Sequence, residues 1–165
     1  MAESIIKFLE NLIGNSPNLI TFIVASLPIS ELRGAIPLAI LEYGFSPGKA
    51  YFIAVLGNFL PILPLLLFLN YLTDKLAARS GLFRKFFNWW FERTRKRSSL
   101  IEKYEAIGLT LFVAIPLPVT GAWTGCVAAY LFKIRSRFAI PCIMCGVLIA
   151  GVVVTLTTLG IKGLF

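Results

Sequence analysis

The sequence predicts an all-α integral membrane protein, an inverted repeat whose halves each contain a re-entrant helical hairpin and a transmembrane helix. The composition is 58% apolar and only 15% charged, with a mean hydropathy of +0.83, whereas about a quarter of the residues in soluble domains are charged. Two uncharged stretches, 50–72 and 138–160, reach the roughly 20 apolar residues that cross a bilayer. A weak internal repeat relates the two halves.

The repeat aligns LITFIVASLPIS (19–30) with LTLFVAIPLPVT (109–120) at a constant offset of 90 residues. Both blocks end in L-P-[IV]-[ST], so that Ser30 matches Thr120. Each block is followed by a polar break, a second apolar arm, a short turn and then one of the two long apolar stretches. The shared order of features indicates a duplicated unit.

Each interrupted block could form one kinked crossing or a re-entrant hairpin, and counting lysines and arginines on the two sides does not separate these alternatives. Prolines and glycines crowd the breaks, and proline removes a helical hydrogen bond. Arms of about 10 residues are short for a full crossing. A hairpin plus one span gives an odd number of crossings, so the second half would be inverted. The residues that we expect to shape the hairpins are Pro28, Gly34, Pro37, Pro116, Pro118, Gly121 and Gly125.

The chain is predicted to form a single membrane domain over residues 1–165. Its parts are a first repeat (1–72, with an interfacial helix, a hairpin at 19–42 and a span at 50–72), a linker (73–105) and a second repeat (106–165, with a hairpin at 106–132 and a span at 138–160).

The linker carries nine basic residues and the aromatic cluster FFNWWF. Aromatic side chains beside lysine and arginine suit the headgroup region, so the linker is expected to be amphipathic and attracted to anionic lipid. Basic residues stay on the cytoplasmic side. We therefore expect a multi-pass protein of the cell's inner or plasma membrane with a cytoplasmic linker.

Three motifs give the chain a family resemblance: SELRGAIPLAI at 30–40, GNFLP at 57–61 and PLPVTGAWTG at 116–125. With these motifs the chain resembles the putative small multidrug export proteins, a family of small bacterial and archaeal membrane proteins. Its layout is also similar to the DedA superfamily of lipid-carrier transporters and scramblases. That similarity implies facing re-entrant hairpins.

Glu31 and Arg33 are the main candidates for a functional site. An ionisable side chain within the membrane is costly, so its presence is a functional-site hypothesis by default. The carboxylate could take up protons and the guanidinium could hold an anion. The alternatives are an ion pair that pins the hairpin, or a shallow loop among the lipid headgroups. At a separation of two residues, a mutual pair needs an irregular backbone.

Other polar residues near the breaks complete the candidate site. Ser30 and Thr120 could face each other across a pseudo-two-fold axis, or each could cap the helix that follows its break. Asn58 could contact substrate or bind the free backbone of a hairpin. Trp123 could be a gate or an interface anchor. The predicted substrate- or ion-binding set is Glu31, Arg33, Ser30, Asn58, Thr120 and Trp123.

These features favour a transporter, either a secondary transporter or a translocase for a lipid carrier or anionic substrate. The alternative is a membrane scaffold or assembly factor that acts through the basic linker. An enzyme is not expected, because there is no histidine, no G-x-S-x-G and no convincing set of metal ligands. We therefore expect no cofactor and no metal.

The expected partners are membrane lipid, a second or further copies of the chain, and a lipid phosphate or small charged molecule as substrate. The net charge of +8 does not indicate nucleic-acid binding, since the basic residues lie between spans.

Overall fold

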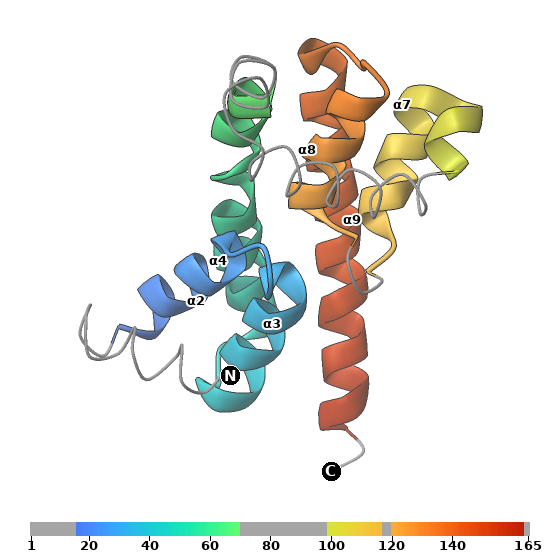
Figure 1. Ribbon diagram of the computed structural model, residues 1–165. Coiled ribbons are helices and arrows are strands. Elements are labelled where there is room, and N and C mark those ends of the chain that lie inside the picture. The colour runs from blue at the N-terminus through green and yellow to red at the C-terminus, as the bar shows by residue number, and fades with distance from the viewer. Residues whose placement is uncertain (1–15, 70–98, 117–119, 164–165) are drawn as a thin grey trace. The chain divides into compact units, whose positions relative to one another are not determined.

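The structure, a computed structural model, describes residues 16–69, 99–116 and 120–163, and every regular element within these ranges is helical (Figure 1). The elements are α2 (Pro17–Ser26), α3 (Glu31–Pro37), the π-helical turn η1 (Leu38–Glu42), α4 (Pro47–Phe59), α7 (Ser99–Ala114), α8 (Ala122–Leu131) and α9 (Ser136–Lys162). A turn at 60–61 separates α4 from a further helical stretch at 62–69. The predicted all-helical class is confirmed.

Two helices are long and apolar enough to cross a membrane, Pro47–Leu69 and Ser136–Lys162. They lie within a few residues of the predicted spans, although residues 70–72 fall outside the described ranges. One side of the first helix exposes large apolar side chains at helical spacing, which suits a hydrocarbon surrounding. These side chains are Phe52, Leu56, Leu60, Leu63 and Leu67.

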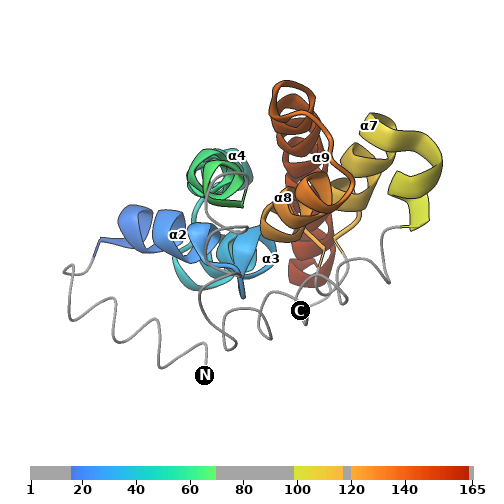
Figure 2. The ribbon, with the colours of Figure 1, turned by 45° about the horizontal axis from the view of Figure 1, so that its top comes forward.

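The chain divides into two compact units, one formed by residues 1–58 with 151–165 and the other by residues 59–150. In the first unit α2 packs against α3, and Figures 1 and 2 both show α2 crossing α4. Gly57 lies at this crossing, because a Cβ atom there would collide with the carbonyl oxygen of Phe22. The absence of a side chain at Gly57 therefore sets the close approach of these two helices.

In the second unit α7 packs against α8 and crosses the first half of α9. A Cβ atom at Gly146 would lie 2.6 Å from Val113 Cβ and 2.8 Å from the carbonyl oxygen of Thr110. A Cβ atom at Gly125 would lie 2.6 Å from Val113 Cγ2. The missing side chains of Gly125 and Gly146 thus allow α8 and α9 to lie close to α7.

Some predicted parts lie outside the described residues. They include most of the predicted interfacial helix, the linker up to residue 98, and Pro118. Helix α7 begins at Ser99, within the range predicted for the linker. The re-entrant path, the inverted repeat and the domain boundaries remain predictions.

Candidate functional site

The first break begins where α2 ends, and side chains there replace the missing helical hydrogen bonds. The last four carbonyls of a helix have no N–H partner within the helix. Three of them accept hydrogen bonds from side chains: Ser26 Oγ donates to Ile23 O at 2.7 Å, Ser30 Oγ to Val24 O at 2.7 Å, and Asn58 Nδ2 to Ala25 O at 2.9 Å. The break is therefore a built turn rather than a loose loop.

Glu31 occupies a strained position in this turn. Its φ is +45°, in the left-handed region that costs a residue other than glycine about 1–2 kcal/mol. Its N–H donates to Leu27 O at 3.1 Å, and its side chain is only 8% exposed. Strained backbone persists where the surrounding structure enforces it, and such positions cluster at functional sites. A buried carboxylate on a strained residue is the most unusual feature of the first break.

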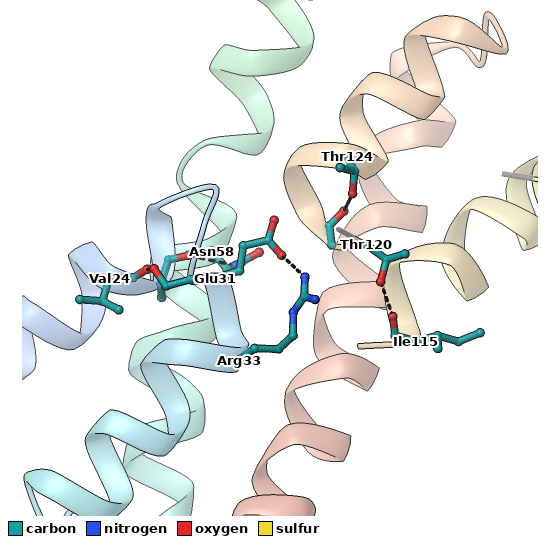
Figure 3. A network of polar contacts seen from close by, with 10 residues as sticks. Val24, Glu31, Arg33, Asn58, Ile115, Thr120 and Thr124 are labelled. Atoms are coloured by element: carbon teal, nitrogen blue, oxygen red, sulfur yellow. Dashed lines mark hydrogen bonds and ion pairs between the residues drawn. The ribbon is translucent and has the colours of Figure 1, made fainter. Parts of the chain in front are cut away.

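Arg33 forms an ion pair with this carboxylate, with Arg33 Nη2 lying 3.7 Å from Glu31 Oε2 (Figure 3). This distance exceeds that of a hydrogen bond. The Arg33 side chain is 30% exposed, several times more than that of Glu31. The left-handed backbone at Glu31 provides the irregular geometry that a pair two residues apart requires. The positive end of the pair is therefore the more accessible one.

Asn58 binds the same break from α4. Besides donating to Ala25 O, it is buried at 1% exposure. Its Oδ1 is buried and accepts no hydrogen bond from the residues that the structure describes. Asn58 thus binds the backbone of α2 through Nδ2, and its Oδ1 can still accept a hydrogen bond from a ligand.

The second break lies between α7 and α8. Thr120 Oγ1 donates to Ile115 O at 2.6 Å, and Thr124 Oγ1 donates to Gly121 O at 3.3 Å (Figure 3). Gly121 has φ 155° and ψ −163°, a conformation almost restricted to glycine. Trp123 lies half-buried in the first turn of α8. Gly121 thus lets the chain turn sharply into α8.

Ser30 and Thr120 have matching roles that the sequence did not predict. The Ser30 side chain does not cap the helix that follows its break. Each hydroxyl reaches back to a carbonyl at or just past the end of the preceding helix. For Ser30 the capping alternative therefore had the wrong direction. This direction depends on how the end of the preceding helix lies in space, so no local sequence pattern could have revealed it.

Four of the six predicted site residues come together at the end of α2, namely Ser30, Glu31, Arg33 and Asn58. Thr120 and Trp123 belong to the second break. Sequence reasoning missed Ser26, whose hydroxyl completes the capping of α2. Within the described ranges no three His, Cys, Asp or Glu side chains gather into a metal site.

One comparison places the chain among known proteins. A family model described as "Putative small multi-drug export protein" matches residues 31–153, which is 123 of the 165 residues. The match begins at Glu31 and includes both long helices in large part, together with the second break. No curated protein and no solved structure matches the chain.

Proposed function

The chain belongs to the putative small multi-drug export protein family, and on this premise we propose that it is a membrane transporter for an anionic substrate. The family name and the two candidate spans make it a membrane protein of an export family rather than an enzyme. The substrate class that we propose is a lipid phosphate or another small anion. The recognition site is the first break, with Arg33 as the anion-binding group.

The observation that carries this proposal is the unequal exposure of the ion pair. Arg33 is 30% exposed and Glu31 is 8% exposed, with 3.7 Å between their charged atoms. A guanidinium binds carboxylate and phosphate oxygens through two parallel hydrogen bonds. An anion that enters the break would meet this cation first. Glu31 then holds Arg33 in place when no anion is bound.

The re-entrant path remains part of the proposal, and short arms support it. At the first break, helix α2 has 10 residues and α3 has 7, so that neither is longer than about 15 Å. The hydrocarbon core is about 30 Å thick. Irregular backbone at membrane depth is tolerated where it is buried in protein or lines a watery cavity. Half-depth arms that meet at a capped break fit these limits.

An internal duplication is supported by equivalent contacts in the two units. In each, the first arm packs against the second, and a hydroxyl matched by the repeat caps the end of the first arm. In each, a glycine of a long helix contacts the first arm, Gly57 against Phe22 and Gly146 against Thr110. We propose that Thr120 and Trp123 form the second-repeat counterpart of the first break.

The further parts of the proposal are contact with membrane lipid, assembly as a homodimer or larger homo-oligomer, and a cytoplasmic basic linker. With 165 residues the chain has little material to enclose a path alone. The scaffold alternative rests on a linker whose larger part lies outside the described residues.

Transport by the purified protein in proteoliposomes tests the function. The panel should contain lipid phosphates, small organic anions and cationic drugs. We expect movement of an anion, and we expect Arg33→Gln to abolish it. Lys49→Gln is the matched control, because it removes an exposed positive charge of the same unit outside the break. Transport of cations alone, or an Arg33→Gln variant as fast as Lys49→Gln, would refute the proposal.

A further inference from the structure

A buried oxygen atom without a hydrogen-bond donor lies at the end of α2. Asn58 is 1% exposed, and its Oδ1 accepts no hydrogen bond from any described residue. The bond from Nδ2 to Ala25 O at 2.9 Å fixes the amide orientation, since a flipped amide would set two oxygens against each other. Leaving a buried acceptor unsatisfied costs about 1–3 kcal/mol. A bound positive charge or hydrogen-bond donor would remove this cost.

Other groups at this helix end are acceptors as well. Asn58 is tied to Ala25 O, and Glu31 is tied through its N–H to Leu27 O, so both residues lie at the same helix end (Figure 3). The carbonyl end of a helix carries a partial negative charge. The Glu31 carboxylate adds a full one. This combination of helix end, amide oxygen and carboxylate attracts a cation that prefers oxygen ligands.

The chemistry of these oxygens selects the cation. An amide oxygen does not bind a proton near neutral pH, so Asn58 is unsuited to carrying one. Calcium sites use 6–8 oxygens, often from several carboxylates, and the described residues contain no cluster of three potential metal-binding side chains. In transporters with broken helices, unwound carbonyls and helix C-termini coordinate Na⁺. A single carboxylate matches the charge of one monovalent ion.

We infer that Asn58 Oδ1 and the Glu31 carboxylate, at the carbonyl end of α2, form a sodium site. This inference rests on the proposed function, because the sodium ion would be the coupling ion for the anion at Arg33. An anion that binds Arg33 weakens its hold on Glu31, which lies 3.7 Å away. Arg33 then competes less strongly with sodium for the carboxylate. Each ion therefore raises the affinity for the other by the same factor.

The second unit shows that this kind of helix crossing does not require an amide. Gly57 precedes Asn58 on α4, whereas Gly146, the glycine at the matching crossing, precedes Val147. Val147 is buried at 1% exposure. A buried valine thus follows the glycine at that crossing, without a polar atom. Asn58→Val is accordingly the variant that removes the oxygen while keeping a residue the crossing accepts.

The experiment measures sodium binding to the full-length protein in nanodiscs. The unfolding midpoint is recorded in sodium, potassium and choline chloride at equal ionic strength, and radioactive sodium gives the affinity directly. We expect sodium to raise the midpoint of the parent saturably. In Asn58→Val the affinity should fall at least about tenfold, which corresponds to ~1.4 kcal/mol. Thr21→Val is the matched control, because it removes a 2.8 Å side-chain hydrogen bond of α2 away from this helix end. Its sodium response should persist.

If Asn58→Val fails to fold, radioactive sodium binding to Glu31→Gln replaces it, and loss of binding is again expected. A parent that binds no sodium, or an Asn58→Val variant that binds it like the parent, overturns the sodium site. Anion transport that is independent of sodium overturns the coupling role and leaves the proposed function standing. Saturable sodium binding that depends on Asn58, in a protein that transports no anion, supports the site and removes the proposed function.

Discussion

At the scale of single residues, the chain accepts three unfavourable features within one turn. Glu31 combines a buried carboxylate with a left-handed backbone, and Asn58 keeps a buried oxygen without a donor. Neither the buried carboxylate nor the unsatisfied oxygen is needed to end a helix, since Ser26 Oγ, Ser30 Oγ and Asn58 Nδ2 already cap α2. Costs that the fold does not require are typical of functional positions. This is the physical reason for locating the site at the first break.

Neutralising the pair separates a functional role from a structural one. Because Arg33 is 30% exposed, water can solvate it after Glu31→Gln, and the loss of the pair should cost about 1 kcal/mol or less. We expect Glu31→Gln to purify as folded protein with an unfolding midpoint near that of the parent, and Arg33→Gln to be less stable because it leaves the buried Glu31 carboxylate without this cation. Both should lack transport, and the double variant should not regain it.

A purely structural pair would behave differently. Each single variant would then be strongly destabilised, by about 3–5 kcal/mol as for a broken buried pair, and the double variant would recover. Unfolding midpoints of the four proteins, measured together with transport, distinguish the two roles.

At the scale of elements, the long helices were predictable and the turns were not. An apolar run of about 20 residues must be buried in lipid or protein. The ends of the run therefore predict the ends of the helix to within a few residues. The predicted spans 50–72 and 138–160 thus correspond to the observed helices Pro47–Leu69 and Ser136–Lys162. The direction in which Ser30 caps depends on how α2 lies in space, which no local pattern contains. The π-helical turn after Pro37 was missed for the same reason.

Close helix crossings provide a prediction about stability. A Cβ atom at Gly57 would meet the backbone of Phe22, which cannot move aside as a flexible side chain can. We expect Gly57→Ala to separate α2 from α4 and to lower the free energy of unfolding by about 1–3 kcal/mol. Gly160→Ala is the control in α9, since no atom lies within 4 Å of its Cβ position. Alanine there should raise stability by up to ~1 kcal/mol.

Thermal unfolding of the purified variants in one detergent gives both values. Equal midpoints for Gly57→Ala and Gly160→Ala would show that the α2–α4 crossing is looser than described. The same comparison extends to Gly146→Ala, where a Cβ atom would lie 2.8 Å from Thr110 O.

At the scale of the whole molecule, the sequence predicted membrane class and family, because both depend on composition and on motifs that run along the chain. The family match over residues 31–153 confirms the resemblance. The site was predicted only in part. Glu31 and Arg33 stood out because charge is rare in apolar surroundings. The unsatisfied oxygen of Asn58 could not be foreseen, since it depends on a contact across 33 residues of sequence.

The central claim is that each interrupted segment enters and leaves the membrane on one side, with the second half inverted. Single cysteines at Lys49 and Arg135, both exposed, test it most directly when Cys126, Cys142 and Cys145 are first replaced. An impermeant thiol reagent is applied to intact cells and to inverted vesicles. The account predicts that position 49 is labelled from outside and position 135 from inside. Labelling of both positions from the same side would contradict it, because two fully spanning segments would bring them to one face.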